Sequence, residues 1–383
     1  MSFKVLICDY VGLAFDALGL PNPSEVRAHI ERKGGVFHLG TSQKAISGKI
    51  NFYYAPELST REELLAATAQ AVFDAVIAAA TFIPSECVFV QGGVRIGSGT
   101  GNMGSDSWGG PNGLGGAAPL MNTPGFNAVA TAQMTMRALL HFRPTLPLLK
   151  LHARVVAGSF DTGKHLRDFP TAKLAGQTLA ILGYGNIGRE VAKLAAAFGI
   201  YVKVYAREKH HARISADGFI PAVTAIDAAR GADAISVHTG LGALDSVTQR
   251  FANQDLINAE VLSALNVRAT VLNFDRGECV DAEALNSAMA SGQVANAAID
   301  ADIFNQDGKL SGPMVAYLPL AEKFGNRILL LPHAAADTDH PSRVAGAMQA
   351  VDQIFDALVH QRVTNLKGDL PTGYVNVGVK LGV

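Results

Sequence analysis

Two ionisable side chains, Arg276 and His333, lie where apolar stretches typical of buried strands come to an end. In an open parallel sheet, ligands bind beyond the carboxyl ends of the strands. A guanidinium can hold a carboxylate and polarise a carbonyl, and an imidazole can protonate an alkoxide near neutral pH. The pair therefore fits the reduction of a 2-keto acid by hydride transfer. His238 also ends such a stretch, and position alone gives it an equal claim.

A glycine-rich loop lies between a predicted strand and a predicted helix that leads to a second strand. The loop reads Gly183, Tyr184, Gly185, Asn186, Ile187, Gly188. In this setting Gly183 permits a tight turn, Gly185 lets the backbone approach a pyrophosphate, and Gly188 lets the helix pack on the strand. The helix N-terminus offers N–H groups to the phosphates. The pattern predicts a bound dinucleotide, and a glycine-rich turn without a ligand is the alternative.

The end of the second strand bears on which dinucleotide binds. An acidic residue there binds the ribose 2′-hydroxyl, whereas an arginine accommodates a 2′-phosphate. Arg207 stands at this position, with Lys209 and His210 behind it, although Glu208 could take the role of the acid. We therefore favour NADP(H) over NAD(H), with a solvated surface charge as the alternative role for Arg207.

Near-continuous apolar strands alternating with helices predict a parallel sheet that is covered on both faces. The expected strands are residues 4–9, 87–90, 177–183, 200–206, 232–238, 269–274, 295–300 and 327–333, and the expected helices are residues 61–80, 127–142, 189–198 and 342–360. Residues 97–118 are rich in glycine and predict a loop. This loop is either a flexible surface insertion or a substrate or interface loop with Trp108 as its anchor.

The composition excludes several classes of protein. The 383 residues are 49% hydrophobic and 17% charged, with a net charge of -1, so no electrostatic signature of nucleic-acid or membrane binding is present. The N-terminus lacks the pattern of a signal peptide, and the most apolar window, residues 71–83, is too short to span a membrane. Three cysteines without a CxxC pair indicate neither a disulfide framework nor a zinc site. We expect a soluble, cytoplasmic protein without a metal.

The chain resembles the D-isomer-specific 2-hydroxyacid dehydrogenases, the family that includes glyoxylate/hydroxypyruvate reductase and D-3-phosphoglycerate dehydrogenase. The matching segments follow the order of the family and come close to its spacings; they are residues 122–125, 174–199, 237–239, 273–281 and 332–333, together with Asp300. The resemblance implies an α/β protein with two doubly wound parallel-sheet domains. A Rossmann dinucleotide-binding domain, residues 125–334, would be inserted in a flavodoxin-like substrate domain built from residues 1–124 and 335–383.

The resemblance also implies roles for individual residues. Arg276 would bind the carboxylate and carbonyl of a small 2-keto or D-2-hydroxy acid, and His333 would be the acid/base. The remaining residues would line the cofactor and substrate sites; they are His238 and Thr239 in the cofactor cleft, Asp300 on the nicotinamide side, and the loop Gly97, Ser98, Gly99, whose N–H groups would hold the carboxylate. A homodimer is implied as well, formed in part by the helix after Asn122.

The chain departs from the family pattern beside the predicted acid/base. The family usually has a glutamate, five residues beyond the aspartate at position 300, that pairs with the histidine. This chain has Asn305, which can hydrogen-bond an imidazole but supplies no charge. Asp302 or Asp307 could replace the glutamate if the loop differs.

Two further departures concern Gly240, which stands where the family prefers proline, and residues 104–118, an insertion beside the substrate loop. Because of the insertion, the identity of the substrate does not carry over. The amide at Asn305 leaves a formate dehydrogenase-like enzyme as one alternative. A redox-sensing protein that resembles the dehydrogenase-like corepressors is the other, although Arg276 and His333 favour an enzyme.

Overall fold

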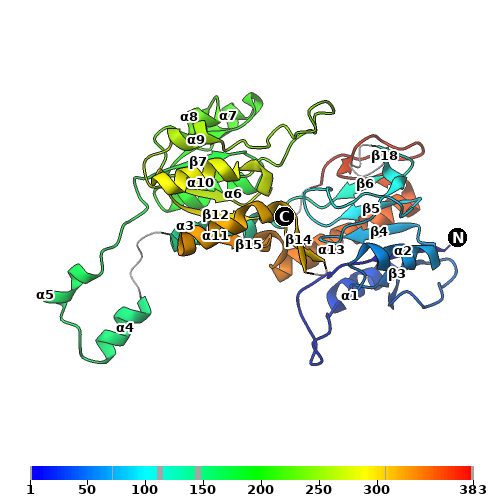
Figure 1. Ribbon diagram of the computed structural model, residues 1–383. Helices are drawn as coiled ribbons and strands as arrows, with labels where there is room; N and C mark the ends of the chain where they lie inside the picture. The colour runs from blue at the N-terminus through cyan, green and yellow to red at the C-terminus, as the bar shows by residue number, and fades with distance from the viewer. Residues whose placement is uncertain (1, 71, 110–114, 143–147, 307, 381–383) are drawn as a thin grey trace. The chain divides into compact units, whose positions relative to one another are not determined.

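The chain forms two compact units, each built around its own sheet. The computed structural model describes residues 2–70, 72–109, 115–142, 148–306 and 308–380 (Figure 1). Unit 1 consists of Met1–Asn127 and Ala336–Val383, and unit 2 consists of Ala128–Ala335. Each unit has a seven-stranded, mainly parallel sheet, so the predicted α/β class with two parallel-sheet domains is confirmed.

Unit 2 contains a fully parallel sheet in the order β15-β12-β11-β10-β7-β8-β9. Its strands are β7 (Thr178–Leu182), β8 (Tyr201–Tyr205), β9 (Ile220–Ala222), β10 (Ala234–Val237), β11 (Ala269–Asn273), β12 (Val294–Asp300) and β15 (Ile328–Leu331). The strand order reverses between β7 and β10, where chain connections leave in opposite directions. In doubly wound sheets this switch point is the place where ligands bind.

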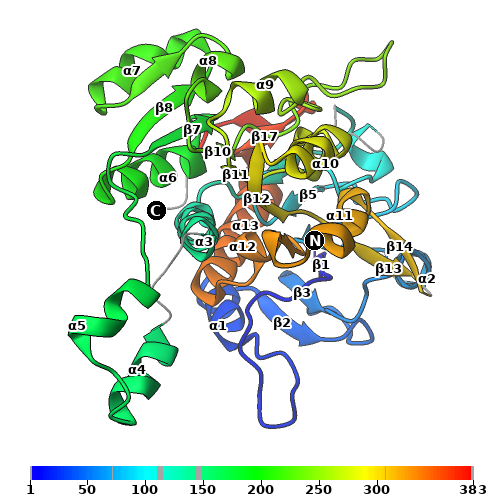
Figure 2. The ribbon, with the colours of Figure 1, turned by 60° about the vertical axis from the view of Figure 1, so that its left-hand side comes forward.

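Helices cover both faces of this sheet. They are α3 (Ala128–His141), α6 (Asn186–Ala197), α7 (His211–Ala216), α8 (Ala225–Ala229), α9 (Ala259–Ala264), α10 (Ala282–Ser291) and α11 (Leu318–Phe324). One apolar cluster includes Val261, Leu285 and Leu320 from α9, α10 and α11. The other includes Met136 and Val191, because α3 and α6 pack side by side on the opposite face (Figure 2). Two covered faces explain why the strands are apolar throughout.

Unit 1 joins the start of the chain to its end. Its sheet has the order β17-β6-β5-β4-β1-β3-β2, in which only β17 is antiparallel to its neighbour. The strands are β1 (Phe3–Ile7), β2 (Val36–Leu39), β3 (Ile50–Tyr54), β4 (Ala75–Ala78), β5 (Gly92–Arg95), β6 (Leu120–Asn122) and β17 (Leu366–Lys367). The long helix α13 (His340–His360) lies beside α1 (Ser24–Arg32) and buries Val351 and Ile354 against Ile7 and Ile77.

Smaller elements complete the two units. They are α2 (Arg61–Gln70), α4 (Leu148–Val156), α5 (Thr162–His165), α12 (Ala334–Asp337), the hairpin β13 (Phe304–Gln306) and β14 (Lys309–Ser311), the pair β16 (Arg362–Val363) and β18 (Val375–Asn376), and the 3₁₀ helices η1 (Asp106–Trp108), η2 (Leu166–Asp168), η3 (Glu208–His210), η4 (Gly277–Cys279), η5 (Pro313–Tyr317) and η6 (Gly325–Arg327). None of the helices in the described ranges is long and apolar enough to cross a membrane.

Two of the predicted elements in unit 1 are wrong. The helix expected over residues 61–80 ends at Gln70, and Ala75–Ala78 form β4 between β1 and β5. A short apolar run fits a buried strand as well as a helix, so periodicity could not separate them. Residues 87–90 form no strand, and the Phe89 N–H donates to the Ser107 hydroxyl at 2.6 Å instead of to a neighbouring strand.

The glycine-rich stretch is anchored in the core of unit 1. Trp108 is 1% exposed, stacks on Phe89 with ring centroids 6.2 Å apart, and donates its indole N–H to the Met103 carbonyl at 2.9 Å. The interpretation of this segment as a flexible surface insertion is therefore wrong at Trp108, while a role of the loop toward a substrate or an interface, with Trp108 as its anchor, stays a prediction. Residues 110–114 of the predicted insertion lie outside the described residues.

Candidate functional site at the carboxyl edge of the unit 2 sheet

Two glycines of the dinucleotide loop are required by close packing of the chain on itself. Gly183 follows β7 with a φ of 103°, and a Cβ atom there would lie 2.2 Å from the carbonyl oxygen of His238. A Cβ atom on Gly188 would lie 2.1 Å from the carbonyl oxygen of Gly183. Any side chain at either position would force strand, turn and helix apart.

Gly185 is different, because it faces open space. Its φ is -80°, which any residue adopts, and no heavy atom lies within 4 Å of the position of a Cβ. It is the N-cap of α6 and provides no side-chain hydrogen bond to the first turn, which begins with Asn186 and Ile187. The N–H groups of this turn lack intrahelical acceptors. The N–H groups at the start of α6, together with the open space at Gly185, fit the pyrophosphate of a bound dinucleotide.

Positive charge gathers at the end of β8. Arg207 is exposed and precedes the 3₁₀ helix η3, which carries Lys209 and His210. The pKa of His210 is lowered, first by burial and then by the nearby charges of Arg207 and Lys209. Glu208 forms no ion pair with Arg207 among the described residues. The cluster therefore presents net positive charge where the second strand of the motif ends, as the sequence predicts.

His238 is excluded as the acid/base by its surroundings. Its side chain is buried at the end of β10, and its Nε2 shares a hydrogen bond with the Ser236 hydroxyl at 2.8 Å. Burial lowers the pKa of His238 to about 3, so the ring stays neutral at ordinary pH. Its carbonyl packs against Gly183, and the adjoining Thr239 donates its hydroxyl to the Gly240 carbonyl. Both residues thus lie beside the dinucleotide loop.

Arg276 stands on a turn that the end of β11 fixes. The side-chain amide of Asn273 donates to the Arg276 carbonyl at 2.9 Å, while its oxygen accepts the Asp275 N–H at 3.2 Å. The guanidinium itself is about a quarter exposed, and its Nη1 lies 3.3 Å from Oδ2 of Asp302. The backbone of Arg276 is thus fixed by Asn273 and one guanidinium nitrogen by Asp302. The other N–H groups of the guanidinium remain available to a ligand at the edge of the sheet.

His333 follows β15 in a conformation that is rare for its residue type. Its φ is 57°, in the left-handed region that side chains usually avoid. The side chain is only 16% exposed, and Nδ1 has no hydrogen-bond partner within the described part of the chain. The nearest carboxylate oxygen, Oδ1 of Asp302, lies 4.0 Å from Nδ1. Strain at a non-glycine residue with an unsatisfied ring nitrogen is a feature of functional sites.

One carboxylate, that of Asp302, thus faces both Arg276 and His333. The predicted pairing of Asn305 with His333 is not seen: Asn305 lies in β13, is exposed, and accepts the Gly308 N–H through its side-chain oxygen at 3.0 Å. Asn305 is part of the β13–β14 hairpin, so the carboxylate nearest to His333 is that of Asp302, three residues earlier in the chain. Asp307, the other alternative, lies outside the described residues.

Asp300 organises the backbone that follows His333. It is buried, and its two carboxylate oxygens accept the N–H groups of Ala334 at 2.7 Å and Ala335 at 3.2 Å. These bonds fix the start of α12 immediately after the histidine. Sequence reasoning missed this function, because Asp300 lies 34 residues before Ala334 and no local pattern links the two. The contact of Asp300 with the cofactor stays a prediction.

The loop with Ser98 and Gly99 belongs to unit 1, after β5. Gly97 has a φ of 114°, a backbone conformation that favours glycine at this position. Thr123 accepts the Gly97 N–H at 2.8 Å through its hydroxyl, and Asn122 donates to the Ser98 carbonyl. The roles of Ser98 and Gly99 toward a substrate stay predictions.

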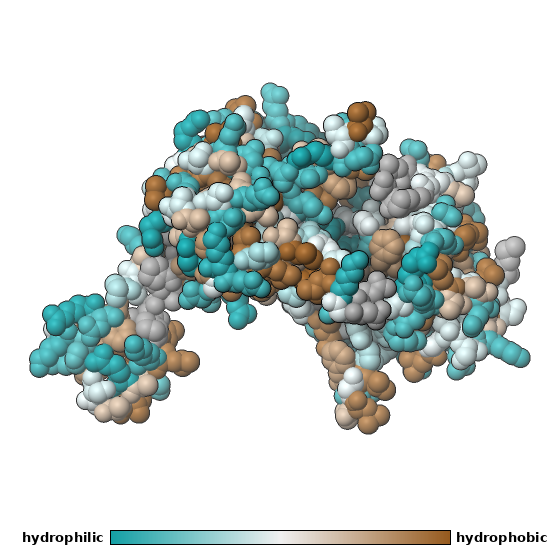
Figure 3. Space-filling view, viewed as in Figure 1, coloured by the Kyte–Doolittle hydropathy of each residue, from teal (hydrophilic) through white to brown (hydrophobic). Residues whose placement is uncertain are grey.

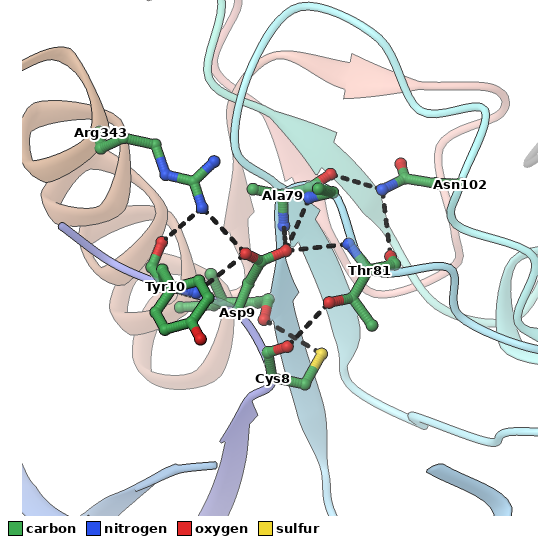
Figure 4. A network of polar contacts seen from close by, with 9 residues as sticks. Cys8, Asp9, Tyr10, Ala79, Thr81, Asn102 and Arg343 are labelled. Carbon is green, nitrogen blue, oxygen red and sulfur yellow. Dashed lines mark hydrogen bonds and ion pairs between the residues drawn. The ribbon is translucent and has the colours of Figure 1, made fainter. Parts of the chain in front are cut away.

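A buried ion pair between Asp9 and Arg343 lies at the carboxyl edge of the unit 1 sheet (Figure 4). Oδ2 of Asp9 accepts three successive backbone N–H groups, those of residues 79–81, at 3.0, 2.6 and 2.9 Å. Oδ1 accepts the Tyr10 N–H and Nη2 of Arg343, both at 2.9 Å. Asp9 thus ties the loop after β4 to helix α13.

Comparison with known proteins adds evidence that the geometry cannot give. The family model described as D-isomer specific 2-hydroxyacid dehydrogenase, NAD binding domain, matches residues 142–335. A putative 2-hydroxyacid dehydrogenase of Haemophilus influenzae is 31% identical over 197 residues, 51% of this chain and 56% of that protein. The hydroxypyruvate reductase of Thermotoga maritima is 28% identical over 240 residues, 62% of this chain and 70% of that protein. The chain thus matches little more than half of the length of the first of these relatives.

Solved structures agree on the fold. A 3-phosphoglycerate dehydrogenase of Entamoeba histolytica with bound NAD+ superimposes on this chain with a TM-score of 0.67 and 18% sequence identity. The alignment covers 97% of this chain and 100% of that one. Identity this low supports the fold alone. Together with the family model, which covers half of the chain, these matches show that the chain belongs to the D-isomer specific 2-hydroxyacid dehydrogenase family.

Proposed function

We propose that the protein reduces a small 2-keto acid to the D-2-hydroxy acid with a nicotinamide dinucleotide, or catalyses the reverse oxidation. The observation that carries this proposal is the sharing of one carboxylate, Asp302, by Arg276 and His333 at the edge of the sheet where the dinucleotide loop also lies. A cation and a proton-carrying imidazole held together are what carbonyl reduction requires.

Each residue has a distinct part in this reaction. A reduced nicotinamide dinucleotide, held at the loop of Gly183, Gly185 and Gly188, would supply the hydride for the carbonyl carbon of the substrate. Arg276 binds the substrate carboxylate and polarises the carbonyl through its N–H donors. His333 gives a proton to the developing alkoxide from Nε2, because Nδ1 faces Asp302. The hydride becomes the hydrogen on the carbinol carbon and the proton becomes the hydrogen of the hydroxyl group. In the reverse oxidation the hydroxyl proton returns to His333.

The proposal extends to the cofactor and the substrate. We favour NADP(H) over NAD(H), since Arg207 and Lys209 supply positive charge and no acidic partner of Arg207 is seen among the described residues. The substrate is a small 2-keto acid, and Ser98 and Gly99 are predicted to hold its carboxylate.

Turnover tests the proposal directly. Oxidation of NADPH and NADH would be followed by absorbance with glyoxylate, hydroxypyruvate, pyruvate, phenylpyruvate and 2-ketobutyrate. We expect turnover that His333→Ala reduces by about 100-fold or more, as loss of a general acid does. The matched control is Asn305→Ala, which leaves turnover near that of the wild type because Asn305 is engaged with Gly308. Tight binding of a dinucleotide without reduction of any acid would instead favour the redox-sensor alternative.

We further propose that the protein is a homodimer. Helix α4 has no buried residue, and it exposes Leu148, Leu149, Val155 and Val156. Figure 3 shows apolar and polar side chains together on the visible face of the α4–α5 segment, at the lower left. A second copy of the chain would cover these apolar groups, which a soluble monomer rarely exposes side by side.

A further inference from the structure

The 3₁₀ helix η5 contacts the chain at both partners of the ion pair between Arg276 and Asp302. The pair joins Nη1 of Arg276 to Oδ2 of Asp302 at 3.3 Å. Near the start of η5, the backbone N–H of Met314 donates to the Asp302 carbonyl at 3.1 Å. At the end of η5, the hydroxyl of Tyr317 lies against the turn that carries Arg276. One short element thus meets the backbone on both sides of the pair.

Tyr317 makes the most direct contact with the Arg276 turn. Its side chain is 1% exposed, and its hydroxyl lies 2.6 Å from the carbonyl oxygen of Gly277 and 2.7 Å from that of Val280. The hydroxyl carries one hydrogen, so the two carbonyls share a single donor. Gly277 directly follows Arg276 and begins the 3₁₀ helix η4. Because Asn273 already holds the Arg276 carbonyl, the turn is fixed by side chains that come from both directions along the chain.

Two glycines allow η5 to approach this closely. A Cβ atom on Gly277 would lie 2.7 Å from Cβ of Pro313, the first residue of η5. A Cβ atom on Gly312, which precedes η5, would lie 2.8 Å from the carbonyl oxygen of Asp302, and its φ of 97° also favours glycine. A side chain at either position would therefore displace η5 or the segment that it contacts. The same element thus sets the spacing between the backbone of Arg276 and that of Asp302.

We propose that Tyr317 is a positioning residue for substrate binding that acts through Arg276. Its hydroxyl fixes the turn on which Arg276 stands, and η5 holds this turn at the distance from Asp302 that the ion pair requires. A guanidinium binds a carboxylate best through two parallel N–H donors, so the interaction depends on the exact place of the guanidinium. Binding of the substrate then depends on a buried hydroxyl that does not itself contact the substrate. This inference rests on the proposed function, in which Arg276 holds the carboxylate.

The first experiment separates positioning from a loss of stability. KM and kcat for glyoxylate and pyruvate would be measured for the wild type and for Tyr317→Phe, which removes only the hydroxyl. A merely structural defect leaves less folded enzyme, so it lowers the apparent kcat without changing KM. A displaced Arg276 weakens the hold on the substrate in every folded molecule, and we expect KM to rise on the order of tenfold. An unchanged KM in Tyr317→Phe would overturn the proposal.

Two comparisons connect the effect to Arg276. Tyr374→Phe removes the same atom in unit 1, where the hydroxyl donates to Oε1 of Gln91 at 3.0 Å, so KM should stay that of the wild type. In Arg276→Lys, the added Tyr317→Phe change should raise KM no further, because the residue through which Tyr317 acts is already altered. Independent effects of the two changes would contradict action through Arg276. If Tyr317→Phe folds poorly, Pro313→Gly removes the ring that packs on the same turn, and an unchanged KM in that variant would overturn the proposal equally.

The second experiment needs neither cofactor nor turnover. In isotope-labelled protein, arginine Nε–Hε groups give NMR signals, and the signal of Arg276 is identified by its absence in Arg276→Lys. We expect Tyr317→Phe to shift this signal and Tyr374→Phe to leave it in place. An unmoved signal in Tyr317→Phe would refute the positioning role even if turnover fell. If no 2-keto acid is reduced but the signal shifts in Tyr317→Phe, the proposed function fails, while the positioning of Arg276 by Tyr317 stands.

Discussion

Replacing Gly185 by alanine separates the binding of the dinucleotide from the folding of its loop. The added methyl group meets no heavy atom within 4 Å, and the φ of -80° suits alanine. Glycine-to-alanine changes at such positions stabilise a fold by about 0.4–1 kcal/mol. Alanine is a poorer N-cap than glycine, which offsets this gain, so we expect Gly185→Ala without cofactor to stay close to the wild type in stability. The methyl group nevertheless occupies the space over the N-terminus of α6 that the pyrophosphate requires.

The size of the effect follows from linkage. A ligand present at 100 times its Kd stabilises the folded protein by about 2.7 kcal/mol. If the methyl group weakens binding by about 100-fold, the same concentration equals Kd, and about 0.4 kcal/mol remains. For a domain of this size, 1 kcal/mol shifts the unfolding temperature by roughly 2–4 °C. NADPH should then raise the unfolding temperature of the wild type by about 5–10 °C and that of Gly185→Ala by about 1 °C.

The assay is thermal unfolding with and without NADPH and NADH. Gly188→Ala is the matched control, because its methyl group would lie 2.1 Å from the Gly183 carbonyl oxygen. Overpacking of this kind costs about 1–3 kcal/mol, so this variant loses stability before any cofactor is added. A full cofactor-induced shift in Gly185→Ala would refute the placement of the pyrophosphate over Gly185. A large loss of stability in Gly185→Ala without cofactor would refute the open space at that residue.

Three further predictions address the cofactor, the assembly and the buried ion pair. Arg207→Ser should weaken NADPH binding by about tenfold or more and leave NADH unchanged in fluorescence titrations, since a hydrogen bond to a charged group contributes roughly 1.5–3 kcal/mol; equal losses for both cofactors would contradict the role of Arg207. Leu149→Glu should convert a dimer to a monomer in light scattering, and an unchanged mass would exclude α4 from the interface. Asp9→Ala should lower the free energy of unfolding in urea by about 3–5 kcal/mol, because it removes the carboxylate that accepts four backbone N–H groups and one N–H of Arg343; Arg343→Met should cost less, as the carboxylate keeps its backbone N–H donors, and the reverse order would contradict this reasoning.

The sequence predicted the parts of unit 2 whose signals are local. The turn from β7 into α6 could be identified because glycines, strand and helix lie within one short segment. Arg276 and His333 were found because both follow strands. His238 could not be excluded from sequence, since only its burial lowers its pKa to about 3. The strand β4 was missed because its four apolar residues also fit a helix.

Contacts between distant residues were beyond the reach of sequence reasoning. Asp302 was only one of several candidates for the partner of His333, since the hairpin after it determines which side chain reaches the imidazole. The bond between Asp275 and Gly240 joins residues 35 positions apart, and nothing in the local pattern of either residue indicates it. Trp108 has a glycine-rich neighbourhood typical of an exposed loop, and only the packing on Phe89 shows that it is buried.

The contact between Asp9 and Arg343 also bears on the order in which the chain folds during synthesis. The two residues are 334 positions apart, and α13, which covers the strands of unit 1, is synthesised only after all of unit 2. Unit 2 is continuous, so it can complete its sheet while the N-terminal strands still lack their cover. Apolar strands exposed for that period are prone to aggregation. The two parts of unit 1 thus come together only after the whole of unit 2 has been synthesised, and the strands of unit 1 remain uncovered for that interval.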